Sequence, residues 1–91
     1  MEWIWDERKE LANYRKHGIR FEIAVQVFED EFHLTEADPH PDDNRWQTIG
    51  LVGMATLFVV HAEIDDAGIG WIISARRATP PERRVYETLR V

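Results

Sequence analysis

A chain of 91 residues with a net charge of −6 at pH 7 is long enough for one domain, residues 1–91, and no apolar run approaches the roughly 18–20 residues that a membrane-spanning helix needs. The chain holds no cysteine, which excludes disulfides, thiol catalysis and cysteine-ligated zinc and fits a reducing compartment. Its start shows no basic segment ahead of an apolar stretch, the mark of a secretory signal, so we expect a cytoplasmic protein.

The first predicted elements are a short strand and a helix. Trp3-Ile4-Trp5 is apolar and strand-like, and Asp6 after it is a good N-cap for a helix that buries Leu11 and Tyr14. We expect Lys16-His17-Gly18 to end this helix, because basic side chains suit the negative end of the helix dipole and glycine suits the left-handed position beyond it.

A second helix is predicted directly afterwards. Phe21, Ala24, Val25 and Phe28 stand at i, i+3, i+4 and i+7, which is the apolar stripe of one helix face. Arg20 is a poor N-cap, so this helix is expected to depend on packing.

The middle of the chain predicts strands. After an edge strand at 32–36 and a loop at 38–43, strands are expected at 46–51, 55–64 and 69–76, with turns at Val52-Gly53-Met54 and Asp65-Asp66-Ala67-Gly68. Their connections are too short for a parallel crossover, so the three strands form an antiparallel meander.

The closing helix has the clearest start signal. Thr79-Pro80-Pro81-Glu82 combines a threonine N-cap, proline at the first helical position and glutamate at the third, which is a capping box. The helix is expected to run to about Leu89 and to turn Val85 and Leu89 inward. Together the elements predict an α+β architecture: two N-terminal helices, a curved antiparallel sheet made of the meander with short edge strands, and a C-terminal helix.

Charge is unevenly distributed along the chain. Residues 1–20 hold five basic and four acidic side chains, residues 21–70 one and eleven, and residues 71–91 five and two. One interpretation is a solvated acidic loop followed by an arginine-rich helix face. The other is a phosphate-binding patch at the end of the chain, with the acidic region facing a basic protein partner.

Short motifs along nearly the whole chain resemble, in the same order, the BrnT-type toxins, which are the toxin halves of type II toxin–antitoxin pairs. The matching residues are Trp5-Asp6-Glu7, Lys9, Asn13, Lys16-His17-Gly18, Phe21-Glu22, Ala24, Val27-Phe28, Asp30, Arg45, Ile49-Gly50, Val59-Val60, Ile72-Ile73-Ser74-Ala75-Arg76, Ala78, Glu82-Arg83-Arg84 and Tyr86-Glu87.

The resemblance implies a prokaryotic, cytoplasmic relative of RelE-like ribonucleases that cleaves RNA and blocks translation. It also implies a hetero-oligomer with a BrnA-type antitoxin, whose DNA-binding part represses the shared operon. The chain departs from the family at His61-Ala62-Glu63-Ile64, where Tyr, Thr, Glu and Arg are usual, and at Trp71, where Arg is frequent. Two basic side chains are therefore missing, which motivates an alternative: a degenerate homologue that binds the antitoxin without cleaving RNA.

The candidate catalytic residues are chosen for RNA cleavage without a metal or other cofactor, in which the 2′-OH attacks the adjacent phosphorus. Arg76 ends a predicted strand and Arg83 begins the closing helix, so both are expected to contact one phosphate with their forked donors. His61 is a candidate base or acid on the neighbouring strand, and Glu63, two residues on, is a candidate base or a group that orients it. For His61 a half-buried structural role is the alternative, and for Arg83 it is salt bridging to Glu87 on the helix surface.

Three further residues are candidate substrate contacts. They are His17, Arg84 and Tyr86. The alternative for His17 is capping of helix carbonyls, that for Arg84 is salt bridging to Glu87, and that for Tyr86 is core packing.

The acidic loop is not expected to bind a metal. Asp38, His40, Asp42 and Asp43 stand in a proline-broken segment without a spacing that sets coordination geometry, so we interpret it as a solvated loop. Acidic residues in 29–43, with Trp46 or Trp71, are candidates for the antitoxin surface, because aromatic side chains are enriched at interfaces.

Overall fold

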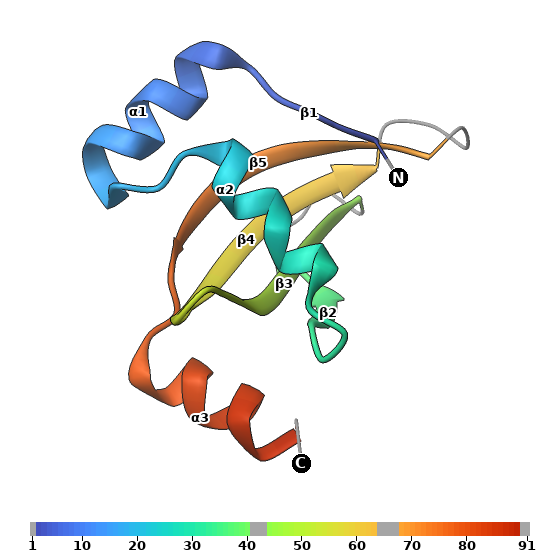
Figure 1. Ribbon diagram of the computed structural model, residues 1–91. Coiled ribbons are helices and arrows are strands. Elements are labelled where there is room, and N and C mark those ends of the chain that lie inside the picture. Colours follow the sequence, from blue (N-terminus) through green and yellow to red (C-terminus); the bar gives the residue numbers. More distant parts are fainter. Residues whose placement is uncertain (1, 41–43, 64–67, 90–91) are drawn as a thin grey trace.

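The protein is built on a five-stranded mixed sheet with three helices (Figure 1). The computed structural model describes residues 2–40, 44–63 and 68–89. The elements are β1 (Glu2–Ile4), α1 (Glu7–His17), α2 (Phe21–Ala24), a 3₁₀ helix (Val25–Glu29), β2 (Leu34–Ala37), β3 (Arg45–Val52), β4 (Ala55–Glu63), β5 (Ile69–Arg77) and α3 (Pro80–Leu89). Among these residues no helix is both long and apolar enough to cross a membrane.

Helix α1 begins and ends where the sequence predicts. The Asp6 side chain accepts from the backbone N–H groups of Arg8 and Lys9, and Gly18 takes a left-handed conformation (φ 74°) with its N–H donated to the Tyr14 carbonyl. The predicted core contacts of this helix are wrong. Leu11 and Tyr14 are exposed, and the buried residue is Asn13.

Asn13 ties α1 to the sheet. Its amide donates to the carbonyls of Ile19 and Ala75, at 3.2 and 2.8 Å, and its oxygen accepts from the Ala75 N–H at 3.1 Å. A polar residue is buried here because both ends of its amide are hydrogen-bonded.

The second predicted helix changes form after one turn. Its α-helical part ends at Ala24 and a 3₁₀ helix follows, so the residues with no exposed surface are Phe21, Ala24 and Val27, spaced by three. The Glu10 carboxylate accepts from the Phe21 N–H at 2.9 Å, which gives this helix the cap that Arg20 does not supply.

The predicted meander of β3, β4 and β5 is confirmed, but the sheet is mixed rather than antiparallel. The strand order is β1-β5-β4-β3-β2, and β1 runs parallel to β5, with Trp3 opposite Gly70. Gly70 is required there, because a Cβ atom would lie 2.2 Å from the Trp3 ring. The pairing of the first strand with the last is a contact that local patterns do not encode.

The two faces of the sheet have different partners. The inner face, which packs against α1, α2 and the 3₁₀ helix, carries Leu57, Val59, Ile72 and Ala75. Side chains alternate along a strand, so Phe58 and its pair Arg76 stand on the outer face, next to α3. Figure 1 shows α3 at the opposite end of the molecule from α1.

The capping box of α3 is confirmed, but its inward face is not the predicted one. The Thr79 N–H donates to Glu82 Oε1 at 2.8 Å, and the Glu82 N–H donates to Thr79 Oγ1 at 3.4 Å. Val85 and Leu89 are 51% and 63% exposed, whereas Tyr86 is 1% exposed. The helix is rotated this way because Glu82 and Tyr86, four residues apart on one side, both bond to groups outside the helix.

Candidate functional site

Arg76 is held at the junction of β5 and α3. Its NH1 and NH2 groups donate to the two carboxylate oxygens of Glu82, at 2.8 and 3.0 Å, and NH1 also donates to the Arg77 carbonyl. The guanidinium lies over the Phe58 ring, 4.1 Å from its centre. A forked pair of this kind fixes the plane of the guanidinium and leaves the Nε–H and one NH2 hydrogen free of these contacts.

Each partner stabilises the charge of the other. The hydrogen bonds from Arg76 hold the pKa of Glu82 at about 2, and those to Glu82 raise the pKa of Arg76. The pair is therefore ionised throughout the physiological range. Arg76 remains partly exposed, so it is oriented but still accessible to a ligand.

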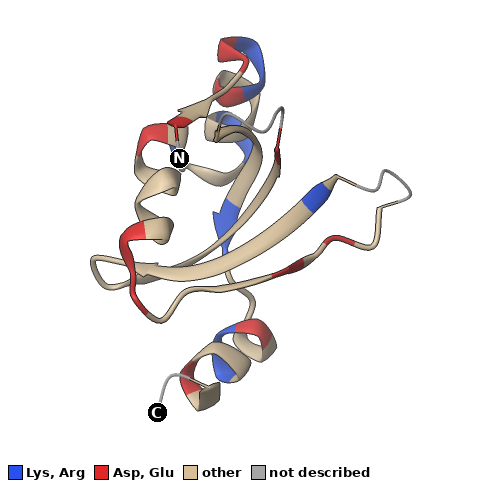
Figure 2. Cartoon of the chain, turned by 90° about the vertical axis from the view of Figure 1, so that its right-hand side faces the viewer, with Lys and Arg blue, Asp and Glu red and all other residues tan. Residues whose placement is uncertain are grey.

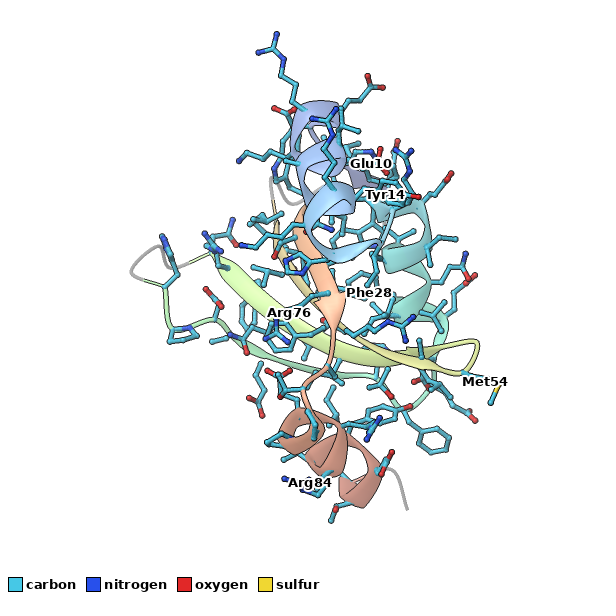
Figure 3. All side chains as sticks on the ribbon, turned by 90° about the vertical axis from the view of Figure 1, so that its left-hand side faces the viewer. Glu10, Tyr14, Phe28, Met54, Arg76 and Arg84 are labelled. Carbon is cyan, nitrogen blue, oxygen red and sulfur yellow. The ribbon has the colours of Figure 1, made fainter. Side chains whose placement is uncertain are left out.

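Two more arginines stand on α3 beside this pair. Arg83 follows Glu82 directly, is 56% exposed, and lies 3.8 Å from Glu87 across one helical turn. Arg84 is exposed and projects from α3, while Arg76 lies above it on the strand (Figure 3). Figure 2 shows these basic segments at the end of β5 and on α3, with acidic segments along the middle of the chain.

A small hollow of about 170 Å³ separates α3 from the outer face of the sheet. It is lined by Leu34, Glu36, Gln47, Ile49, Phe58, Glu82 and Val85. We define the arginine cluster as Arg76, Arg83 and Arg84, which stand at the junction of β5 and α3. Arg76 adjoins this hollow through Glu82, and the hollow also holds the carboxylate of Glu36, whereas Arg84 lines a separate hollow on α3. No histidine lines the described part of this hollow.

His61 lies on the inner face of β4, so the expectation that it shares a site with Arg76 is wrong. It is 5% exposed, and its Nε2 atom is 2.7 Å from the Thr48 hydroxyl, which in turn is 2.8 Å from that of Thr35. Burial, with a smaller contribution from the charge of His33, lowers the pKa of His61 to about 4. Its neutral ring is held by Thr48 and is surrounded by the rings of Trp3 and Phe28.

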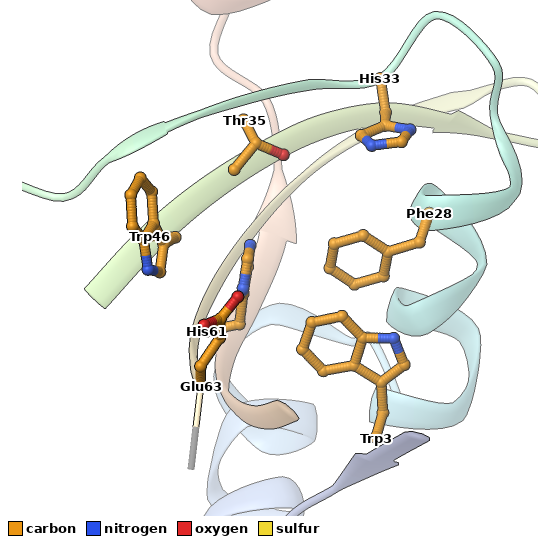
Figure 4. Close-up of a pocket in the computed structure, with 7 residues that line it drawn as sticks. All are labelled: Trp3, Phe28, His33, Thr35, Trp46, His61 and Glu63. Carbon is orange, nitrogen blue, oxygen red and sulfur yellow. The ribbon is translucent and has the colours of Figure 1, made fainter. Parts of the chain in front are cut away.

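His61 and Glu63 line a second, larger cavity of about 420 Å³, with Trp3, Phe28, His33, Thr35 and Trp46 (Figure 4). We expected Glu63 to orient His61. Instead, the Nδ1 atom of His61 has no hydrogen-bond partner among the described residues, and Thr48 is the group that orients the ring. This aromatic cavity, as we call it below, opens on the inner side of the sheet, away from the arginine cluster.

Two predicted substrate contacts lie outside the arginine cluster. The Tyr86 ring is buried and its hydroxyl donates to the Asp30 carboxylate, so it offers no face on which a base can stack. His17 is the last residue of α1, which packs on the inner face through Asn13. The burial of Tyr86 agrees with its alternative, core packing, whereas the capping of helix carbonyls by His17 stays a prediction.

Sequence reasoning missed Asp30, which links three elements. Besides the Tyr86 hydroxyl, its carboxylate accepts from the backbone N–H groups of Leu51 and Phe32, at 2.7 and 2.9 Å. The sequence placed it among the residues shared with the BrnT-type toxins and among the acidic residues considered for the antitoxin surface, with no bonding role. Asp30 accepts from a backbone N–H of β3 and from a hydroxyl of α3, and the residues next to it in the sequence indicate neither bond.

The acidic loop is described only in part. Asp38 accepts from Gln47 at 2.6 Å, which lowers the pKa of its carboxyl, and lies 3.4 Å from Arg45, whereas Asp42 and Asp43 lie outside the described residues. Within the described ranges no three His, Cys, Asp or Glu side chains group together as metal ligands do.

Comparisons with known proteins agree with this fold. Residues 5–82 match the family described as "Ribonuclease toxin, BrnT, of type II toxin-antitoxin system". The chain is thus one of the small α+β toxins of type II toxin–antitoxin systems, and it belongs to the BrnT family.

A solved relative supports the same assignment. The chain is similar to the ribonuclease toxin BrnT of Brucella abortus, known from a 1.1 Å crystal structure, with 27% identity and a TM-score of 0.68. The match covers 87% of this chain and 97% of the Brucella one. No curated protein matches the sequence significantly.

Proposed function

We propose that this protein is a cytoplasmic endoribonuclease toxin that cleaves RNA without a metal ion, blocks translation, and is neutralised by a cognate DNA-binding antitoxin of the BrnA type. The observation that carries the proposal is Arg76, a guanidinium fixed by Glu82 and still accessible at the edge of a small hollow. Membership of a ribonuclease toxin family supports it.

RNA cleavage requires the enzyme to stabilise negative charge at one phosphodiester. When the 2′-oxygen attacks phosphorus, the bond to the 5′-oxygen breaks and the phosphate oxygens gain negative charge. The free donors of Arg76 supply two hydrogen bonds to these oxygens, and Arg83, the residue after Glu82, adds positive charge at this end of α3. Because Glu82 already holds the guanidinium in place, little reorganisation is needed as the charge develops.

The roles of the other candidates change with their positions. His61 and Glu63, on the far side of the sheet from Arg76, are left out of the proposed catalytic group. Tyr86 stabilises α3 through its bond to Asp30. His17 is the last residue of α1 and is also left out of the proposed catalytic group.

Expression of matched variants in a bacterial host tests the proposal. The wild-type chain is expected to arrest growth, and Arg76→Gln to relieve the arrest. Arg77→Gln is the control, because it removes the same charge from the next residue, which is exposed on the other side of the strand. If Arg76→Gln arrests growth as the wild type does, the assignment of the phosphate site is wrong.

A non-catalytic protein that binds the antitoxin is the second candidate function. Trp71 favours it, because this residue pairs with Ala62 on the outer face, the face of Arg76, at the position where the family frequently has arginine. This reading expects a stable complex with the antitoxin, no growth arrest by the wild-type chain and no RNA cleavage by the purified protein.

A further inference from the structure

The aromatic cavity is built like a ligand site, and the proposed cleavage does not use it. Its volume of about 420 Å³ lies within the roughly 300–1,000 Å³ of small-molecule sites. The walls are aromatic: Trp3 stacks on Phe28 with ring centres 4.2 Å apart, and His61 meets both rings edge-on. Figure 4 shows Trp46 and Glu63 across the cavity from Trp3.

Two polar atoms in this wall have no partner. Within the described part of the chain, neither Trp46 Nε1 nor His61 Nδ1 makes a hydrogen bond, and both atoms are almost inaccessible to water. A buried N–H without an acceptor is uncommon in folded proteins, since burial removes its bonds to water. The Trp46 N–H would be satisfied by a ligand that brings an acceptor after a small rotation of the rim side chains, whereas His61 Nδ1 donates or accepts according to the tautomer of the ring.

The charge of the lining selects the chemistry of that ligand. Among the described lining residues Glu63 is the only Asp, Glu, Lys or Arg, so no lysine or arginine is there to hold a phosphate. A carboxylate accepts hydrogen bonds but donates none. The ligand therefore needs a flat apolar body, donors toward Glu63, and an acceptor for Trp46.

We propose that the aromatic cavity binds a single unstacked guanine base. Of the four RNA bases, guanine alone places two adjacent donors, N1–H and the N2 amino group, on one edge, with the O6 acceptor next to N1 and N7 beyond it. The two donors match the Glu63 carboxylate, an acceptor matches the Trp46 N–H, and the ring of Trp46 offers a stacking surface. The proposal deepens the proposed ribonuclease function by adding a contact for a base on the face opposite the arginine cluster.

Nucleoside titrations followed by NMR test this site without any cleavage. Guanosine is expected to shift the indole N–H signal of Trp46, identified with Trp46→Phe, and to bind more tightly than adenosine, cytidine or uridine. Glu63→Gln, which keeps the shape of the side chain, is expected to weaken guanosine binding about tenfold or more, the low end of what a bidentate base contact contributes. The matched control is Glu87→Gln, an exposed glutamate on α3.

Three outcomes overturn the proposal: equal affinity for all four nucleosides, unchanged guanosine binding by Glu63→Gln, or a Trp46 signal that does not move. Comparing guanosine with a short RNA that carries one unpaired guanine identifies the source of the base. Tighter binding of the RNA supports an RNA contact, and equal binding supports a free guanine nucleoside. Growth arrest without guanosine binding would refute only the guanine site. Guanosine binding without growth arrest would refute only the proposed ribonuclease function.

Discussion

Removal of one oxygen atom, in Tyr86→Phe, tests whether Tyr86 holds α3 on the sheet or serves the substrate. The ring is 1% exposed and its hydroxyl donates to Asp30, whose carboxylate also accepts from the Leu51 N–H. Phenylalanine keeps the buried ring and deletes only the bond between α3 and Asp30. This bond holds α3 in position on the sheet. Because Glu82 stands on α3, the bond also orients Arg76.

The expected loss follows from the kind of bond removed. A hydrogen bond to a charged group contributes about 1.5–3 kcal/mol. Asp30 keeps its bonds to Leu51 and Phe32, so we expect the lower part of that range, about 1.5–2 kcal/mol in the free energy of unfolding. For a domain of this size, each kcal/mol shifts the melting temperature by about 4–8 °C.

Urea and thermal unfolding of Tyr86→Phe and Tyr14→Phe provide the measurement. Tyr14 is the control, because its ring is exposed beneath Arg20 and its hydroxyl makes no hydrogen bond in the described part of the chain. Tyr14→Phe is expected to unfold like the wild type. An unchanged unfolding midpoint for Tyr86→Phe, together with slower RNA cleavage, would refute the structural role and restore Tyr86 as a substrate contact.

Three further outcomes are expected. Lowering the pH from about 6.5 to 4 should reduce the free energy of unfolding by about 2–3 kcal/mol through His61, because the unfolded histidine takes up a proton that the folded one, with its pKa at about 4, does not; the loss should be smaller in His61→Gln. Asn13→Ala should cost about 2–4 kcal/mol in urea unfolding, since it strips the partners from buried backbone groups of Ile19 and Ala75. Gly50→Ala should lower the melting temperature, because its Cβ atom would lie 2.9 Å from the Val27 carbonyl oxygen.

The sequence predicted those features that are set by residues close together along the chain. The cap at Asp6, the left-handed Gly18 and the capping box at Thr79 and Glu82 involve residues at most four apart, and all three are confirmed. The meander is confirmed for the same reason, because short connections allow only antiparallel pairing of successive strands.

Contacts between residues far apart in the chain could not be predicted from the sequence patterns. The parallel pairing of β1 with β5 joins residues about seventy positions apart, and the rotation of α3 is set by Glu82 and Tyr86 bonding to other elements rather than by the apolar pair Val85 and Leu89. In the second helix, a spacing of three or four fits both helix types, and only packing selects the 3₁₀ form around Val27.

The candidate site was predicted in its residues but not in its grouping. Which face a strand residue occupies depends on pairing register. Arg76 pairs with Phe58, which is three positions from His61 on β4, so Arg76 and His61 stand on opposite faces, although both strands were placed correctly. The relation to RelE-like ribonucleases stays a prediction.

Cleavage of RNA by the purified chain tests the central claim most directly. Wild-type protein, Arg76→Gln and Arg77→Gln would be incubated with the same single-stranded RNA and the initial rates compared. Arg76→Gln is expected to lose about 100-fold in rate, which is what removal of one preorganised donor to a developing oxyanion typically costs, and Arg77→Gln to change little. Equal rates for the two variants would contradict the claim that Arg76 grips the scissile phosphate.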